Sequence, residues 1–395
     1  MTTTPQPPGT VIIHACGRTD VGRAREHNED ALLIADLTTG RASADGELRD
    51  HHAGARGTLF MVADGLGGAA SGEIASGMAT DVILEELRSR WTNTAAVPAG
   101  AASGKVGAAF AAALKGAAET ANARIHAYAL EHPEHKGMGT TVTLAGLLGE
   151  TLYLGQVGDS RAYIIRNGHA EQITKDQSLM QRLVEAGEMT PEEAEQSERR
   201  NIILQALGPE ALVRIDLTHQ PVRRGDVLVL CTDGLSGLVR REEIAAVVGD
   251  GDDLAAAADR LIAMANENGG PDNITVVLAR FDGDVLQRPT SEDSVGHQAY
   301  SISGSAPAVP GAAPARARAL GAQAPEAPGT APRREVPAAL QGNMPYLIAG
   351  IAALIVLLVL LFARLRDSGV LSAPPGPARD DSAAATPSPM PSRTP

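Results

Sequence analysis

The chain has 395 residues, a formal net charge of −13 at pH 7, 44% hydrophobic residues and only 3% aromatic residues. Its length and apolar content are sufficient for one large globular domain or two ordinary ones. The negative charge and the scarcity of aromatic rings argue against a nucleic-acid-binding protein, which needs basic phosphate contacts or stacking platforms.

The N-terminal segment and the two cysteines indicate an intracellular protein. The first ten residues, MTTTPQPPGT, contain neither a basic region nor the apolar run of a signal peptide. Cys16 and Cys231 lie too far apart for a zinc-binding pair and suggest no disulfide framework, so we expect a reducing compartment. We expect residues 1–8 to be disordered and a globular domain to extend over residues 9–284.

Short apolar runs separated by turns predict a largely antiparallel β structure in this domain. The runs are GTVIIHAC, DALLIAD, GTLFMVAD, TTVTLAGLL, TLYLGQVG and RAYIIRNGHAEQIT. The Asn-Gly pair at 167–168 is typical of a two-residue hairpin, and Gly-Glu at 149–150 and Gly-Asp at 158–159 also stand between strand-like runs. Helical blocks over about 71–91 and about 105–131 interrupt the strands. We therefore expect an α+β layered domain.

Four aspartates occupy similar places, at the ends of predicted strands. Asp64 ends the run TLFMVAD and is followed by GLGG, and Asp233 ends VLVLCTD and is followed by GLSG. Asp159 directly follows TLYLGQVG, and Asp272 precedes the run NITVVLA. The Gly-rich loop after Asp64 admits three explanations: a phosphate cradle, a tight turn without chemistry, or a metal site.

The recurrence of this pattern favours the metal site. A nucleotide-binding loop needs GxxxxGK[ST], or GxGxxG followed by an acidic residue about twenty residues on, and neither pattern is found at this loop. A plain turn explains one Asp-Gly pair but not its repetition. Carboxylates gathered in space repel one another unless a cation neutralises them. Because the candidate ligands are all oxygens, the hard cations Mg²⁺ and Mn²⁺ fit best.

The segment RAREHNEDALL places further charged groups before the second predicted strand. Glu29 and Asp30 stand at the start of that strand, and Arg25 precedes Glu29 by four residues. These residues form either a solvated charged turn or two more oxygen ligands with a guanidinium that grips a phosphate bidentately.

Six motifs together make the sequence similar to the metal-dependent protein serine/threonine phosphatases of type 2C, bacterial branch. They are RAREHNED, VADGLGG, GMGTT, VGDSRAY, CTDGL and GPDNITVV, in the family's order between residues 11 and 281. Each motif alone is weak, but the combination is specific. The resemblance implies a four-layer α-β-β-α sandwich, in which helices flank two central antiparallel sheets.

The resemblance also implies roles for the acidic residues and for Arg25. Two Mn²⁺ or Mg²⁺ ions are expected in the active site, with a third, weaker ion near Asp159 and Asp233. The implied metal ligands are Glu29, Asp30, Asp64, the carbonyl of Gly65, Asp159, Asp233 and Asp272. Asp64 is expected to bridge the two ions, and Arg25 to bind the substrate phosphate. Bare glycine backbone around Asp64 would then let metal, water and phosphate approach closely.

One position departs from the pattern of many eukaryotic members. They carry a histidine, thought to act as general acid, where this chain has Leu66. Protonation of the leaving oxygen is then left to metal-bound water, and we interpret His135, before GMGTT, as a loop residue. A cysteine-based phosphatase is excluded, because position 237, six past Cys231, is glycine where that mechanism requires arginine.

Residues 176–207 resemble the family's flap, a segment beside the active site. Thr190, Pro191 and Glu193 form a helix start with a capping box. The charge and length of the segment suit a surface element that selects substrates, although an ordinary helical hairpin on the core explains them equally well.

The composition changes after residue 284. Residues 285–343 are rich in Ala, Pro, Gly and Ser, and we expect a disordered linker. Residues 344–363 carry no charge, and at ~1.5 Å per residue they would span roughly 30 Å, the thickness of a hydrocarbon core. We expect one transmembrane helix there and a short low-complexity tail over 364–395. Arginines flank the segment on both sides, but the lack of a signal peptide favours a cytoplasmic catalytic domain.

We therefore interpret the chain as a membrane-tethered phosphatase that hydrolyses phosphoserine and phosphothreonine in proteins with a water activated by two metals. Its expected partners are phosphoproteins, including a bacterial Ser/Thr kinase. One alternative is a metal-dead phosphatase fold that serves as an interaction module at the membrane, but none of the metal aspartates is missing. A regulator phosphatase of the sporulation type shares the fold; the GMGTT and GDSR motifs and the lack of a sensor domain favour the housekeeping type.

Overall fold

The computed structural model describes residues 10–43, 46–93, 103–195, 197, 199, 201–249 and 253–302. The segments predicted as a disordered N-terminus, a transmembrane helix (344–363) and a tail (364–395) lie outside these residues, as does most of the predicted linker. Within the described ranges, no helix is both long enough and apolar enough to cross a membrane.

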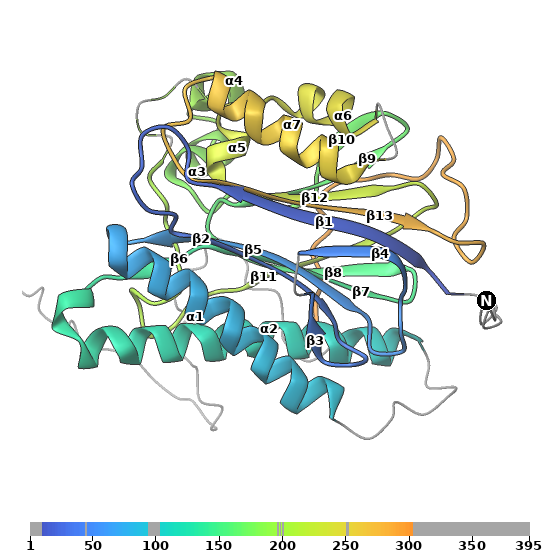
Figure 1. Cartoon of the computed structure of the whole chain (residues 1–395), viewed down its shortest axis with the longest axis horizontal. Helices are drawn as coiled ribbons and strands as arrows, with labels where there is room; N and C mark the ends of the chain where they lie inside the picture. Colours follow the sequence, from blue (N-terminus) through green and yellow to red (C-terminus); the bar gives the residue numbers. More distant parts are fainter. Residues whose placement is uncertain are drawn as a thin grey trace, which may run out of the picture. The chain divides into compact units, whose positions relative to one another are not determined.

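Two antiparallel sheets form the centre of the domain (Figure 1). The first has the order β10-β9-β12-β13-β1-β4, and the second β11-β8-β7-β5-β2-β3, with β6 beside β5. The strands of the first sheet are β10 (His169–Gln172), β9 (Arg161–Arg166), β12 (Val227–Cys231), β13 (Ile274–Asp282), β1 (Ile12–Asp20) and β4 (Glu47–His52). Those of the second are β11 (Asp216–Pro221), β8 (Thr151–Val157), β7 (Val142–Leu148), β5 (Thr58–Leu66), β2 (Asp30–Asp36), β3 (Arg41–Ala42) and β6 (Gly139–Thr140).

Helices cover the outer face of each sheet (Figure 1). The second sheet carries α1 (Ala69–Leu87), its continuation η1 (Arg88–Thr92) and α2 (Ser103–Glu131), and η2 (Pro133–His135) follows α2. The first sheet carries α5 (Asp233–Ser236), α6 (Arg241–Gly249) and α7 (Leu254–Glu267). The flap contains α3 (Leu179–Glu185) and α4 (Pro191–Glu195). The expected α-β-β-α sandwich is therefore confirmed.

Strand β5 shows why the central strands read as continuous apolar runs. Its side chains alternate between two buried clusters, because successive residues of a strand point to opposite faces. Leu59 and Met61 pack in the cluster beneath α1 and α2. Phe60 packs in the cluster between the sheets, where its ring meets Phe281 edge to face at 6.2 Å. A third cluster, which includes Leu261, fills the space between the first sheet and α5–α7.

Local signals in the sequence are confirmed at a turn and at a helix start. Asn167 and Gly168 both have positive φ, as a type I′ turn requires, and they join β9 to β10. In the flap, the amide of Glu193 donates to Thr190 Oγ1 at 3.2 Å, and the amide of Thr190 donates to Glu193 Oε2 at 2.9 Å. This reciprocal pair is the predicted capping box.

The Gly-Asp turn at 158–159 does not join neighbouring strands, contrary to expectation. Strand β8 lies in the second sheet and β9 in the first, so the chain crosses between the sheets at this point. Apolar strands with a short connection are compatible with both arrangements. The crossing places Asp159 between the ends of the two layers.

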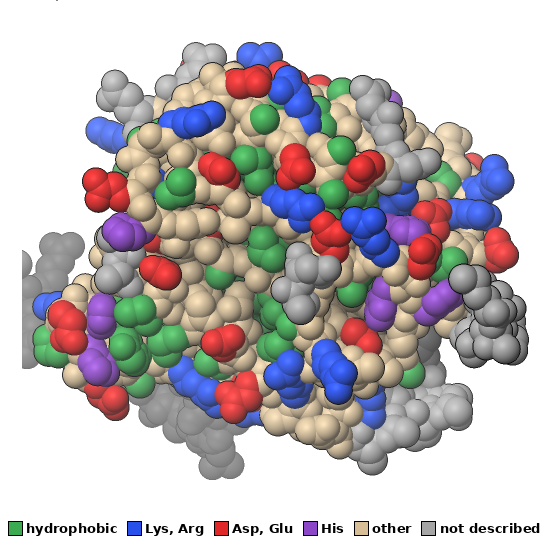
Figure 2. All heavy atoms as spheres, viewed as in Figure 1, with side chains coloured by type: hydrophobic (Ala, Val, Ile, Leu, Met, Phe, Trp, Pro, Cys, Tyr) green, Lys and Arg blue, Asp and Glu red, His purple; other side chains and the backbone are tan. Residues whose placement is uncertain are grey.

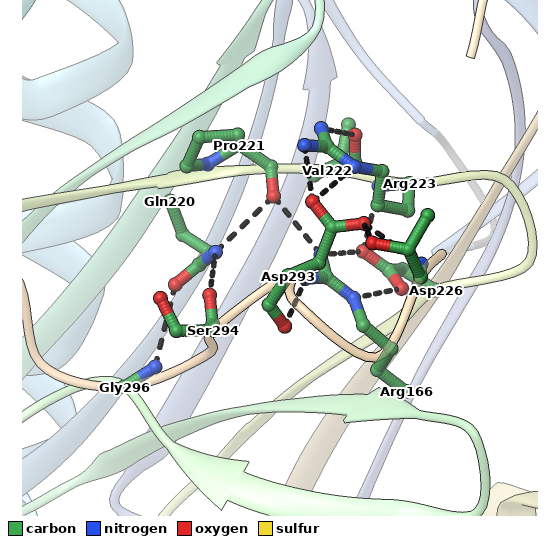
Figure 3. A network of polar contacts seen from close by, with 10 residues as sticks. Arg166, Gln220, Pro221, Val222, Arg223, Asp226, Asp293, Ser294 and Gly296 are labelled. Carbon is green, nitrogen blue, oxygen red and sulfur yellow. Dashed lines mark hydrogen bonds and ion pairs between the residues drawn. The ribbon is translucent and has the colours of Figure 1, made fainter. Parts of the chain in front are cut away.

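The predicted boundary at residue 284 is also wrong, because residues 285–302 pack against the domain. Asp293 pairs with Arg223 (Figure 3). Leu286 is buried, and the amide of Tyr300 donates to Leu217 O of β11 at 2.8 Å. The segment predicted to be a linker from its Pro- and Ser-rich composition therefore begins with residues that make specific contacts with the domain. Elsewhere on the face shown in Figure 2, acidic and basic side chains are interspersed.

Candidate metal centre and phosphate site

Both sheets bring carboxylates to the same end of the sandwich. On the second sheet, Asp64 lies near the end of β5 and is the register partner of Asp30, the first residue of β2. On the first sheet, Asp233 begins α5 directly after β12, and Asp272 precedes β13. Asp159 lies on the crossing between them. The antiparallel layout thus gathers residues that are up to 242 positions apart in the chain (30 to 272).

The backbone of Asp64 is held by two threonines of the GMGTT motif. Its amide donates to Thr141 Oγ1 at 3.1 Å, and its carbonyl accepts from the Thr141 amide at 2.8 Å and from Thr140 Oγ1 at 2.9 Å. The side chain of Asp64 is therefore presented from a fixed backbone.

Two glycines permit the close approach of other backbone at the site. A Cβ atom on Gly65 would lie 2.3 Å from Gly72 O and 2.5 Å from Glu29 O. A Cβ atom on Gly234 would lie 1.9 Å from Asn273 O. Real Cβ contacts are not that short, so the Asp-Gly pairs at both strand ends are required by packing as well as by access to the carboxylate.

Asn273 organises the N-terminal acidic segment. Its Oδ1 accepts from the Glu29 amide at 2.8 Å, and its Nδ2 donates to the carbonyls of Val21 and His27, each at 2.9 Å. Glu29 itself is buried, and the Gly65 amide donates to its carbonyl at 3.1 Å. Asn273 thereby connects the end of the first sheet to the loop that carries Arg25 and Glu29.

The carboxylates are electrostatically close to one another. Burial, followed by the negative charges of Asp30, Asp233, Asp159 and Asp272, raises the pKa of Asp64 well above its ordinary value. Burial also raises the pKa of Asp159 to about 7, with Asp233 adding to the effect. Each of these groups would be easier to ionise if a cation stood among them.

Two further pKa shifts have the same origin. Burial raises the pKa of Asp30, although hydrogen bonds from Thr275 and Thr232 oppose the rise, and it raises the pKa of Asp233, with Asp272 contributing. The site is therefore a group of carboxyls that protein atoms alone do not neutralise.

Unpartnered oxygens support a cation at this place. Asp159 is 6% exposed, yet its Oδ1 has no hydrogen-bond partner among the described residues, and the same is true of the buried Oδ1 of Asp30. Buried carboxylate oxygens without a partner are costly, and a hard cation satisfies them. The donor set of carboxylates and a backbone carbonyl fits Mg²⁺ or Mn²⁺.

The side chains do not stand as a complete metal cage. Among the described residues, no three His, Cys, Asp or Glu side chains are grouped closely enough to hold an ion as they are. Two carboxylates face other partners: Asp272 accepts from Arg25 at 2.8 Å, and Asp30 accepts from Thr232 Oγ1 at 2.9 Å. The convergence and the unpartnered oxygens nevertheless favour a cation site, because rotation about the side-chain bonds turns such carboxylates toward an ion.

A cleft of about 1050 Å³ extends from the acidic centre to the flap. Arg25, Asp159, Asp233 and Asp272 line one end of it. The other end lies between α3, with Met180, and the start of α6, with Arg241, and the residues that line the cleft include no histidine. His135 instead contacts Ser71 Oγ at 3.0 Å from η2, in accord with its interpretation as a loop residue.

Sequence reasoning missed the residues that hold the acidic ones in place. The motifs alone predict no role for Asn273, for Thr232 or for the two threonines of GMGTT. Their signal was present, since each stands inside a motif next to a predicted ligand. Arg161 of GDSR was likewise missed; it donates to Asp176 at the start of the flap, with the closest contact 2.7 Å.

A two-sheet sandwich with helices on both faces and an acidic centre at one end defines a class of metal-dependent phosphoester hydrolases. The family model described as protein phosphatase 2C matches residues 40–279. The chain belongs to the protein phosphatase 2C family and is a metal-dependent Ser/Thr phosphatase.

Relatives of established name support this assignment. The chain is 34% identical over 270 residues to the serine/threonine phosphatase stp of Listeria monocytogenes. This match covers 68% of this chain and 96% of the Listeria protein. It is 36% identical over 271 residues to PstP of Mycobacterium tuberculosis, where the match covers 68% of this chain and 45% of that protein.

The crystal structure of M. tuberculosis PstP resembles the domain with a TM-score of 0.56 at 34% identity, covering 69% of this chain and all (100%) of that one. The catalytic domain of PstP has also been solved in complex with two manganese ions, and it matches with a TM-score of 0.54 at 34% identity, with coverage of 69% and 100%.

Proposed function

We propose that this Ser/Thr phosphatase holds two divalent cations, Mn²⁺ or Mg²⁺, in its acidic centre and acts on phosphoproteins at the cell membrane. The observation that carries the metal assignment is the convergence of Asp30, Asp64, Asp159, Asp233 and Asp272 at one end of the two sheets, with raised pKa values and unpartnered oxygens. The manganese pair in the similar PstP structure supports the same number of ions.

The proposed ligands divide between the two layers of the sandwich. Glu29, Asp64 and the carbonyl of Gly65 come from the second sheet and its preceding loop, while Asp233 and Asp272 come from the first. Asp30 and Asp159 complete the set, the latter with Asp233 for a third, weaker ion. When bound, divalent ions supply a nucleophile by lowering the pKa of water and neutralise the charge of the phosphate.

The chain's own residues bind and orient the substrate. Arg25 lines the cleft beside Asp272, and its guanidinium offers the planar fork that matches phosphate oxygens. We assign it to gripping the phosphate once the carboxylate of Asp272 turns toward a cation. Leu66 stands where many eukaryotic members of the family carry histidine, and the described residues that line the cleft include no histidine. We therefore assign protonation of the leaving oxygen to water at the metal centre.

The metal assignment is tested on the purified full-length protein. We expect hydrolysis of p-nitrophenyl phosphate to require added Mn²⁺ or Mg²⁺ and to stop in excess EDTA, because the carboxylates alone form no anion site. Calorimetric titration of the metal-free protein with Mn²⁺ should show two tight sites and one weaker site. Full turnover in EDTA, or a single site in the titration, would exclude the two-metal centre.

The membrane assignment rests on residues 344–363, which carry no charged side chain over twenty positions. We propose a single pass, with the catalytic domain on the cytoplasmic side and with a Ser/Thr kinase of the same membrane among its substrates. A catalytic domain tethered in this way would work at a high local concentration of membrane-bound phosphoproteins.

Cell fractionation tests the tether separately from the chemistry. We expect the full-length chain in the membrane fraction, resistant to alkaline carbonate, and a variant that lacks residues 344–363 in the soluble fraction with the same activity on p-nitrophenyl phosphate. A soluble full-length protein would overturn the tether and leave the phosphatase assignment intact. For the kinase, loss of ³²P from an autophosphorylated membrane Ser/Thr kinase is the readout.

A further inference from the structure

The segment after β13 is an integral part of the domain, although the matching family model ends at residue 279. We call residues 285–302 the clasp. Its first residues are apolar and packed: Leu286 is 4% exposed and lies, with Val285 and Val295, in the cluster between the two sheets. The Arg224 amide also donates to Gln287 O at 2.9 Å.

The middle of the clasp is anchored through Asp293 (Figure 3). The carboxylate of Asp293 accepts two hydrogen bonds from Arg223, and its carbonyl accepts one from Arg166 at 3.4 Å. Arg166 is at the same time paired with the buried Asp226 at 2.6 Å, with side chains only 5% and 1% exposed. The anchor therefore joins the clasp to a buried ion pair, which restricts where this part of the chain can lie.

The end of the clasp adds to the edge of the second sheet. Two backbone hydrogen bonds join the clasp to the edge strand β11. The amide of His219 in β11 donates to Gln298 O at 3.0 Å, and the amide of Tyr300 in the clasp donates to Leu217 O at 2.8 Å. The ring of Tyr300 lies 5.2 Å from that of Tyr153 and 5.1 Å from that of His219. The otherwise open donors and acceptors of an edge strand are thus satisfied by the chain itself.

Strand β11 is also the first strand that follows the flap (residues 176–207) in the chain. Its first residue, Asp216, accepts from Gln177 Nε2 at 3.1 Å. Gln177 belongs to the entrance of the flap, where its amide donates to Gly158 O and its Oε1 accepts from the Gly158 amide. Its carbonyl accepts from the Leu204 amide near the other end of the flap. Gln177 therefore joins both ends of the flap to the residue before Asp159.

The clasp also lies within electrostatic range of this junction. His297 is half-buried, and its pKa is lowered by this burial and by the charge of Lys175, while Asp216 and Glu185 oppose the shift. Lys175 and Glu185 are themselves paired at 3.2 Å, which connects the entrance of the flap to the end of α3. The clasp thus pairs with the strand whose first residue, Asp216, holds the base of the flap through Gln177.

We propose that the clasp is a positioning element for the phosphatase reaction: by pairing with β11 it fixes the base of the flap at the Asp216–Gln177 junction. A fixed base sets the width of the cleft between α3 and α6, which a folded phosphoprotein has to enter. A small phosphate ester does not need this wall. The proposal rests on the proposed function only in that the substrates are phosphoproteins.

Tyr300→Ala in the full-length chain tests this role. The change removes the two ring contacts and leaves the acidic centre untouched. We expect kcat/KM on a folded phosphoprotein to fall on the order of tenfold, mainly through KM, because flap elements act in substrate capture. Turnover of p-nitrophenyl phosphate with Mn²⁺ should stay within about twofold, and amide hydrogen exchange in residues 179–185 should become faster.

Two matched variants separate positioning from general stability. Tyr300→Phe keeps the ring contacts and should behave as the wild type. Asp293→Asn weakens the other anchor and is expected to lower Tm without changing exchange in α3 or the KM for phosphoprotein. An equal loss of kcat/KM in Asp293→Asn, or unchanged KM and exchange in Tyr300→Ala, would overturn the proposal. If the wild type itself did not hydrolyse p-nitrophenyl phosphate with Mn²⁺, the proposed function would be contradicted instead.

Discussion

Asp64→Asn is expected to abolish turnover while the fold persists. The substitution keeps the shape of the side chain and its backbone contacts to Thr140 and Thr141, but it removes the charge at the centre of the carboxylate group. A bound divalent ion contributes several kcal/mol to the transition state. At about 1.4 kcal/mol per tenfold change, its loss lowers kcat/KM by about 10³-fold or more. Phosphatase assays beside calorimetric Mn²⁺ titration check this expectation.

The same substitution should stabilise the metal-free protein, and the size of this stabilisation depends on pH. The folded-state pKa of Asp64 is raised above the unfolded value of about 3.9, so the folded state loses stability as the pH rises above that value. Asparagine removes this penalty. In EDTA at pH 8, Tm should therefore be higher for Asp64→Asn than for the wild type, and the difference should vanish below about pH 3, where the carboxyl is protonated in both the folded and the unfolded state.

Asp81→Asn is the matched control, since Asp81 is exposed on α1 and far from the motifs. It should change neither activity nor Mn²⁺ binding. Because the acidic residues act as one unit, Asp64→Asn combined with Asp272→Asn should lose little beyond either single variant. A variant at position 64 that keeps both metal and rate would contradict the role assigned to this group.

The sequence was sufficient to predict the layers and the acidic centre, for a physical reason. Runs such as LFMVA are apolar at every position because Leu59 and Phe60 pack into different clusters, and such strands must be covered on both faces. The carboxylates were recognisable because each stands at one end of an apolar run, where a charge is costly unless it has a function. Glycines after Asp64 and Asp233 mark positions where other backbone approaches too closely for a side chain.

The features that could not be predicted from the sequence depend on contacts between residues far apart in the chain. Nothing local distinguishes the Gly-Asp turn at 158–159, which crosses between sheets, from the Gly-Glu turn at 149–150, which joins β7 to β8. The clasp was hidden for the opposite reason. Its composition is that of a linker, and it is held by a few contacts, such as Asp293 with Arg223 and Tyr300 with Tyr153, whose partners lie far away in sequence.

The network of Asn273 was concealed in the same way. One amide side chain connects Val21, His27 and Glu29 to the end of the first sheet, over a separation of about 250 residues. A motif shows that such a residue is present, but only the assembled fold shows what it holds. This network is also what places the loop of Arg25 beside the carboxylates.

Arg25→Ala is expected to lower kcat/KM on the order of 10²-fold or more, the magnitude typical of a lost donor to the transition state. The side chain is 47% exposed and lines the cleft, and its guanidinium lies 2.8 Å from Asp272. A half-exposed ion pair of this kind contributes about 0–1 kcal/mol to stability, so the free energy of unfolding should change little. The loss is thus expected in the reaction and not in the fold.

Arg25→Lys separates charge from geometry at this position. Lysine retains the positive charge but not the planar fork that binds two phosphate oxygens, so its kcat/KM should fall between those of the wild type and Arg25→Ala. Arg23→Ala, an exposed arginine of the same loop, is the control and should retain full activity. Steady-state kinetics on a phosphothreonine peptide at saturating Mn²⁺ provides the measurement. Equal rates for Arg25→Ala and the wild type would reduce Arg25 to a partner of Asp272, and a parallel fall in Mn²⁺ affinity would show that it organises the metal ligands instead of the phosphate.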